Sequence, residues 1–141
     1  MNVEVNYVAI LVASIASMAV GFLWYGPVLF AKPWMKLMGY TKEGMEKAKK
    51  EMGKTYGISF LFTLLSAYVL THIMALSQNF YGYSPVMTGA TSAFWVWLGF
   101  VMPVQATVAL FGGGNWKLFW INTGYQLASL VAMGVVIGLM K

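Results

Sequence analysis

Four long apolar stretches, separated by short polar connections, constrain the fold of this chain more than any other feature. We place them at about residues 7–30, 56–77, 86–111 and 116–140. A helix rises about 1.5 Å per residue, so each stretch is long enough to cross a hydrocarbon core about 30 Å thick. The sequence therefore predicts an all-α integral membrane bundle of four transmembrane helices, forming a single domain over residues 1–141.

The composition favours the same interpretation. Hydrophobic residues make up 60% of the chain and charged residues only 9%, whereas soluble domains average about 25% charged residues. The absence of cysteine excludes disulfides and thiolate metal sites, and we expect neither a metal nor a cofactor. The net charge of +5 does not indicate a nucleic-acid partner, because most lysines lie in one loop and there is no arginine to read bases.

Residues 31–55 form the one strongly polar segment and contain seven of the nine lysines. Thr41 is placed to cap a short amphipathic helix over about residues 42–52, which Gly53 would end. We expect this helix to lie on the lipid bilayer, with docking to a partner protein as the alternative. The lysines that would form this lipid or partner surface are Lys42, Lys47, Lys49, Lys50 and Lys54.

The lysine distribution also predicts which side of the membrane each loop and terminus faces. Lys117 and the lysines of the 31–55 loop share one side of the four-span arrangement, and the opposite side has only Lys141. Cytoplasmic loops carry an excess of lysine and arginine. We therefore expect a cytoplasmic 31–55 loop, with the N- and C-termini outside the cell membrane.

Small residues recur along the predicted spans in the pattern that lets membrane helices pack closely. They are Ala9, Ala13, Ser17 and Gly21 on the first span, Ser59, Thr63, Ala67, Thr71 and Ala75 on the second, and Gly134 and Gly138 on the fourth. Such stripes exceed what one four-helix bundle needs, so we expect self-association. Pro27 and Pro103 predict a kink or a helix end.

Neutral polar side chains within the spans are the candidate polar path or ligand contacts: Tyr25, His72, Gln105, Asn122, Gln126 and Ser129. The last three share one helix face at spacings of four and three, with Ser129 expected in the outer leaflet. This face would either form hydrogen bonds between helices or line a solvated cavity. For His72 we expect a hydrogen bond to a serine or a backbone carbonyl, with proton sensing as the alternative.

Three runs carry a family resemblance: GFLWYGPVLFAKPWMKLMG at 21–39, INTGYQL at 121–127, and MGVVIG, which closes the fourth span. The chain resembles the small prokaryotic four-helix membrane proteins grouped as domain of unknown function 1761. The resemblance covers essentially the whole chain and implies four helices in a prokaryotic membrane. It implies no substrate, reaction or site, so no functional residue is transferred from it.

Two functions remain after this reasoning. The first is a small homo-oligomeric transport or permeation module for an unknown small molecule, with the polar face of the fourth span lining its path. The alternative is a non-enzymatic interaction or scaffold protein that binds lipid or a partner through the 42–52 helix. We expect no enzymatic activity, because the sequence lacks a paired acid and base or an activated nucleophile within the spans.

Overall fold

The structure is a computed structural model that describes residues 2–141. This part of the chain is mainly helical and contains no strand. Its elements are α1 (Tyr7–Trp24), α2 (Ala31–Met38), α3 (Lys42–Tyr81), α4 (Pro85–Val96), the π-helical turn η1 (Trp97–Val101), α5 (Met102–Phe111) and α6 (Trp116–Leu139). Over residues 2–141, four helical stretches are long and apolar enough to cross a membrane: α1, α3, α4 to α5, and α6. The predicted all-α, four-span class is confirmed.

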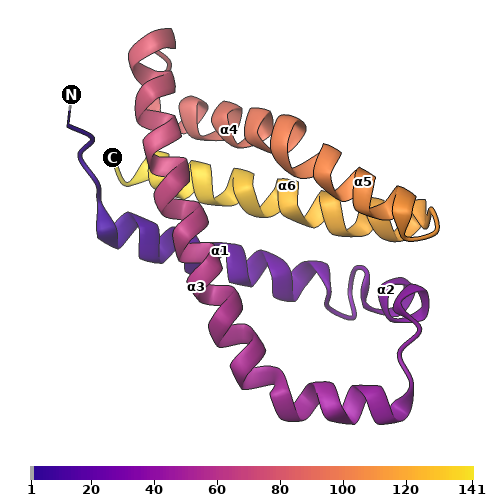
Figure 1. Ribbon diagram of the computed structural model, residues 1–141. Coiled ribbons are helices and arrows are strands. Elements are labelled where there is room, and N and C mark those ends of the chain that lie inside the picture. The colour runs from indigo at the N-terminus through magenta and orange to yellow at the C-terminus, as the bar shows by residue number, and fades with distance from the viewer. Residues whose placement is uncertain (1) are drawn as a thin grey trace.

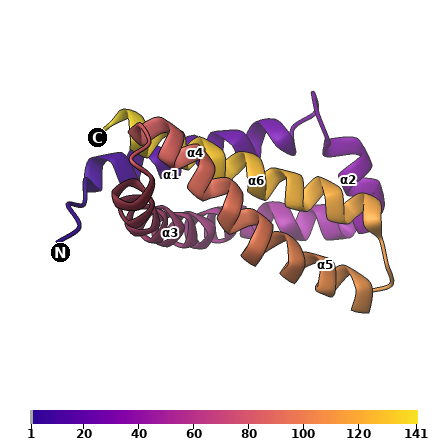
Figure 2. The same cartoon turned by 90° about the horizontal axis from the view of Figure 1, so that it is seen from above.

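Helix α6 lies at the centre of the bundle, packed most extensively against α4 and α1. Figure 1 shows α3 crossing these helices obliquely, with both chain ends on one side of the molecule. We call that side the terminal end. The opposite side, which carries α2, the start of α3 and the α5–α6 connection, is called the lysine end. Figure 2 shows that α4 runs beside α6 whereas α5 moves away from it toward the lysine end.

Packing at the terminal end depends on glycine. A Cβ atom on Gly89 of α4 would overlap the carbonyl oxygen of Gly134 on α6, and the reverse is also true. Gly138 faces the backbone of Pro85 in the same way. The two helices therefore meet backbone to backbone, and the predicted contact role of Gly134 and Gly138 is confirmed, with α4 as the partner.

The two small-residue stripes are covered to different extents. On α1, Ala9, Ala13 and Ser17 are all buried. On α3, Ala67 and Thr71 are buried, but Ser59, nearer the lysine end, is exposed. The oblique course of α3 across the other helices accords with this difference, because the buried residues of α3 are confined to residues 67–74.

The prediction of a separate surface helix ending at Gly53 is wrong. Thr41 does cap the helix, accepting a hydrogen bond from the Gly44 amide at 3.1 Å, but α3 then continues without interruption to Tyr81. A glycine inside a helix costs only about 1 kcal/mol, which the surrounding residues can offset. The left-handed residue that ends α3 is Gly82, with φ 66°. Figure 1 shows α3 bending between its lysine-rich first turns and its apolar part.

The first span is shorter than predicted, and the structure adds a helix that the sequence analysis did not anticipate. α1 ends at Trp24 rather than near residue 30, and the chain turns through Gly26 and Pro27 before α2 begins. Pro27 lacks an amide hydrogen, so a helix end is one of its two expected effects. In the third span, the expected distortion at Pro103 takes the form of the π-helical turn η1, which directly precedes α5.

Candidate functional site

Four of the six polar candidates come together in one cavity at the lysine end. Tyr25, Gln105, Asn122 and Gln126 line a space of about 430 Å³ between α5 and α6, which we call the α5–α6 cavity. Tyr25 follows the last turn of α1, where its backbone amide donates to the Gly21 carbonyl at 3.0 Å. The separation of α5 from α6 after η1 leaves room for this cavity.

The polar groups of this cavity are only partly satisfied by the protein. The Tyr25 hydroxyl donates to Asn122 Oδ1 at 2.8 Å. In the described range 2–141, the side-chain amides of Gln105 and Gln126 have no protein hydrogen-bond partner. Both side chains are partly exposed, so their amides can form hydrogen bonds with groups outside the protein. The cavity is therefore suited to water or to a small polar molecule that can bond to these amides.

Ser129 does not join the cavity. It is 4% exposed, and its hydroxyl forms a hydrogen bond with the hydroxyl of Ser17 on α1. Beyond Ser129, toward the terminal end, the buried core contains Leu130, Met133 and Ile137 of α6. The face predicted from residues 122, 126 and 129 is thus divided, because its first part borders a cavity and its last part is packed between helices.

His72 also lies apart from the cavity, on α3. Its Nδ1 is 3.0 Å from the Tyr68 carbonyl oxygen, and its ring packs on the Tyr68 ring with centroids 4.6 Å apart. The expected hydrogen bond to a backbone carbonyl is confirmed. His72 does not line the α5–α6 cavity, so the structure does not bring it together with the other candidates.

Tyr25 borders two further cavities. The first, the α1–α3 groove, has a volume of about 250 Å³ and is lined by Met18, Gly21, Phe22, Tyr25, Tyr56, Ser59 and Tyr125. The second, the α2–α3 cavity, has a volume of about 550 Å³ and lies between α2 and the first turns of α3. Tyr25 therefore stands where three spaces meet at the lysine end, one of which is the α5–α6 cavity.

Sequence reasoning missed Tyr125, which lines both the α5–α6 cavity and the α1–α3 groove. Its ring packs edge-on against the ring of Tyr25, with centroids 5.2 Å apart. Its place beside Gln126 in the sequence could have signalled this role.

Two tryptophans also have positions that the sequence did not disclose. Trp24 Nε1 donates to the Ile121 carbonyl oxygen at 2.9 Å, and Trp97 Nε1 donates to the Thr123 carbonyl oxygen at 2.8 Å. Trp97 is the first residue of η1 and is buried. These bonds hold α1 and the start of η1 against α6 next to the cavity.

The candidate lysines lie along the first turns of α3 and at the start of its apolar part, and all of them are exposed: Lys42, Lys47, Lys49, Lys50 and Lys54. Only Lys49 among these five lines the α2–α3 cavity. The lysine-rich part of α3 is therefore exposed, and its role as a lipid or partner surface stays a prediction.

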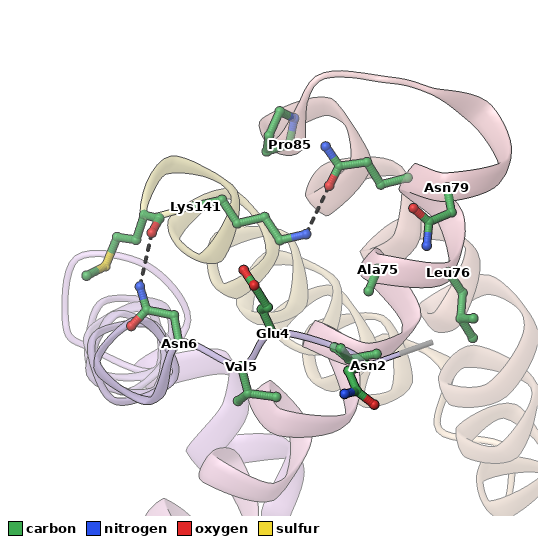
Figure 3. Close-up of a pocket in the computed structure, with 12 residues that line it drawn as sticks. Asn2, Glu4, Val5, Asn6, Ala75, Leu76, Asn79, Pro85 and Lys141 are labelled. Carbon is green, nitrogen blue, oxygen red and sulfur yellow. Dashed lines mark hydrogen bonds between the residues drawn. The ribbon is translucent and has the colours of Figure 1, made fainter.

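A fourth cavity, of about 620 Å³, lies at the terminal end and was not anticipated (Figure 3). Lys141 Nζ donates to Gln78 Oε1 at 2.9 Å, and Asn6 Nδ2 donates to the Met140 carbonyl oxygen at 3.1 Å. Figure 3 shows the Glu4 side chain among these residues. The two bonds fasten the last residues to α3 and to the segment before α1.

Together, four apolar spans and a group of cavities at one end define a helical protein built to cross a membrane, with a partly polar interior. Among the residues that the structure describes, no three His, Asp or Glu side chains gather as a metal site. Residues 8–138 match the model of a family described as "Protein of unknown function (DUF1761)", and the chain belongs to this family. No curated protein and no solved structure matches the chain.

Proposed function

We propose that this protein is a small transport or permeation module of a prokaryotic cell membrane, acting without catalysis on a neutral polar solute. The solute enters the α5–α6 cavity from the lysine end, which faces the cytoplasm, and both termini face outward. The orientation is supported by the lysine distribution. The choice of a neutral solute is supported by the cavity lining, which carries amides and tyrosines but no charged side chain.

One observation carries the proposal. Gln105 and Gln126, from helices on opposite sides of a cavity of about 430 Å³, both present amides that no described protein group satisfies. Both side chains are partly exposed, so their amides stay accessible to a solute, whereas an amide that fixes a bundle is bonded to the neighbouring helix. Asn122 is such a structural amide, since its oxygen accepts from Tyr25.

On the terminal side of Gln126, Ser129 is bonded to Ser17 and the helices pack in a buried core. Within a single chain the solute therefore reaches a binding position but not the other side of the membrane. Transport then requires a second conformation, in which this contact opens. The η1 turn is a suitable hinge, because π-helical turns are frequent at functional sites and α5 already separates from α6 after it.

The proposal is tested by solute entry into proteoliposomes, with glycerol and urea as neutral probes and sodium gluconate as the ionic control. Gln126→Leu is expected to slow entry of the neutral probes at least about fivefold, because it removes an amide worth about 1 kcal/mol to a bound solute. Thr107→Val is the matched control, since the Thr107 hydroxyl bonds only to the Pro103 carbonyl of its own helix. Entry no faster than in protein-free liposomes would refute the proposal.

We include homo-oligomerisation in the proposal. It is supported by the part of the α3 stripe that one chain leaves uncovered, where Ser59 is exposed, since small residues mark close helix contacts in membranes. Cysteine cross-linking in nanodiscs through Thr63→Cys is expected to give dimers or larger species. Exclusively monomeric protein in lipid would contradict this part of the proposal.

A scaffold function is the second candidate, and one observation favours it. The lysine-rich first turns of α3 lie at the edge of the molecule, below α2 in Figure 1, and are almost entirely exposed. A pull-down from membranes with Lys42, Lys47 and Lys50 changed to glutamine tests this function. A partner lost from the variant supports the scaffold function, and unchanged partners count against it.

A further inference from the structure

The α2–α3 cavity has a chemistry that the proposed transport function does not use. It measures about 550 Å³ and is bordered on one side by α2 and on the other by the first turns of α3. Its lining combines aromatic rings, methionine side chains and two charged groups. The residues are Tyr25, Trp34, Met35, Tyr40, Met45, Ala48, Lys49, Glu51, Met52, Thr55 and Tyr56.

Aromatic rings form a continuous series along this cavity. The ring centroids of Tyr25 and Trp34 are 5.2 Å apart, and those of Trp34 and Tyr40 are 5.4 Å apart. The faces of such rings attract organic cations, with tryptophan the strongest of the three aromatic types. The aromatic wall is therefore suited to an ammonium group.

The two charged residues of the lining have opposite signs. Glu51 offers a carboxylate and Lys49 an ammonium group, and both lie on the same stretch of α3. A cation alone would be repelled by Lys49, and an anion alone would be repelled by Glu51. A ligand that carries both an ammonium and a phosphate group satisfies both residues at once.

The α2–α3 cavity adjoins the α1–α3 groove, because Tyr25 and Tyr56 line both spaces. The groove adds Met18 and Phe22, which are apolar. A polar head in the cavity would thus continue into an apolar tail in the groove. This is the division of polarity within a phospholipid.

We propose that the α2–α3 cavity and the α1–α3 groove together bind one zwitterionic phospholipid. Its ammonium group lies among the aromatic rings beside Glu51, its phosphate contacts Lys49, and one acyl chain follows the groove between α1 and α3. The lysine end places the site at the depth of lipid headgroups. Met45 and Met52, 38% and 42% exposed, flank the site with apolar surface that suits a bilayer rather than water.

The test is lipid retention, measured by native mass spectrometry of the full chain released from detergent. Delipidated protein is incubated with equal amounts of phosphatidylethanolamine, which is zwitterionic, and phosphatidylglycerol, which is anionic. The wild type is expected to retain one phosphatidylethanolamine in preference to phosphatidylglycerol. Simple attraction to the lysines predicts the reverse preference, so retention mainly of phosphatidylglycerol would overturn the proposal.

Matched variants separate the site from the general charge of the helix. Glu51→Gln is expected to reduce retained phosphatidylethanolamine about tenfold, because it removes one charge-assisted bond. Glu43→Gln, on the same helix but outside the cavity lining, is expected to change retention by less than about twofold. Lys49→Gln and Lys50→Gln make the same comparison for the phosphate group. Lys49 lines the cavity and its variant should lose lipid, whereas Lys50 lies outside the lining and its variant should not. Equal retention within both pairs would overturn the proposal.

A third arm distinguishes a membrane lipid from a soluble zwitterion. Free phosphoethanolamine, which lacks acyl chains, is expected not to displace the lipid at millimolar concentration. Ser59→Leu, which fills the groove, is expected to reduce lipid retention while circular dichroism shows unchanged helicity. Displacement by free phosphoethanolamine, or full retention in Ser59→Leu, would overturn the assignment of a lipid.

Discussion

The two halves of α6 have opposite surroundings. From Ser129 to Gly138 the helix is packed on α4 and α1, with Gly134 in backbone contact with Gly89. From Trp116 to Gln126 one face of the helix borders the α5–α6 cavity, while Phe119, Ile121 and Thr123 remain buried, and α5 stands away from the helix. The sequence of the helix changes in the same way, because residues 129–138 are almost all aliphatic or small, whereas residues 116–126 include Lys117, Asn122 and Gln126. Polarity and side-chain size both contribute to the difference, since glycine lets two backbones meet and larger polar side chains take up more space between helices.

The boundary between the halves of α6 lies between two hydrogen-bonded residues, Thr123, which is bonded to Trp97, and Ser129, which is bonded to Ser17. Trp97 Nε1 reaches the Thr123 carbonyl oxygen at 2.8 Å, and Ser129 bonds to Ser17. η1 begins at Trp97, so the helix opposite α6 changes geometry at the same level. The terminal half is therefore interpreted as a rigid closure, and the lysine half as the part that admits a ligand.

The largest expected effect comes from filling the glycine contact. Gly134→Leu should lower the free energy of unfolding by about 3 kcal/mol, because the added side chain collides with the backbone of Gly89. SDS-induced unfolding in mixed micelles measures this change. Gly57→Leu is the control, since nothing lies within 4 Å of a Cβ built there. Similar stability of the two variants would remove the basis for a rigid terminal half.

Trp97→Phe should have the next largest effect. It removes the donor to the Thr123 carbonyl and part of a buried ring, at an expected cost of about 1–2 kcal/mol in the same unfolding measurement. Trp95→Phe provides the comparison, because Trp95 is 66% exposed and should change stability by less than about 0.5 kcal/mol. A Trp97→Phe variant as stable as wild type would mean that the Trp97–Thr123 hydrogen bond does not contribute to the stability of the bundle at this boundary.

Tyr25→Phe should cost about 0.5–1 kcal/mol in the free energy of unfolding, through loss of the bond to Asn122. Tyr7→Phe is the matched control, because Tyr7 is 70% exposed. The Asn122 amide then becomes available to a solute, so entry of neutral probes into proteoliposomes should rise or stay constant. A fall in entry would show that the Tyr25 hydroxyl itself binds the solute.

Lys141→Gln is expected to have the smallest effect, below about 0.5 kcal/mol in unfolding free energy. Its bond to Gln78 is exposed, and exposed polar contacts contribute little. Lys117→Gln, at the lysine end, should have a similarly small effect. A cost above about 1 kcal/mol for Lys141→Gln alone would show that the Lys141–Gln78 hydrogen bond, as well as the glycine contacts, stabilises the terminal end.

The sequence predicted the features that arise from local periodicity. The four spans, the Thr41 cap and the contact role of Gly134 could be recognised from residue types at helical spacing. The sequence did not indicate how far α5 diverges from α6. The predicted polar face of α6 therefore included Ser129, which is in fact packed against Ser17. The continuity of α3 through Gly53 was missed because glycine serves equally as a helix stop and as a tolerated interior residue.

The candidate site could be predicted only in part, because helical spacing does not indicate how the helices are arranged around it. Asn122 and Gln126 lie on one helix face, which spacing reveals, and Gln105 was recognised as a polar group at membrane depth. Their meeting with Tyr25 depends on the turn after α1 and on η1, neither of which has a periodic signature. Tyr125 was missed because its role follows from contact with Tyr25 rather than from its own chemistry.

Solvent accessibility along α6 tests the division into halves most directly, and the absence of native cysteine makes it a clean measurement. Single variants Asn122→Cys, Gln126→Cys, Ser129→Cys and Met133→Cys are placed in nanodiscs and treated with a membrane-impermeant maleimide, with Glu43→Cys as the exposed reference. The account predicts reaction at positions 122 and 126 and protection at 129 and 133. Protection at 126, or reaction at 129 as fast as at 126, would contradict it.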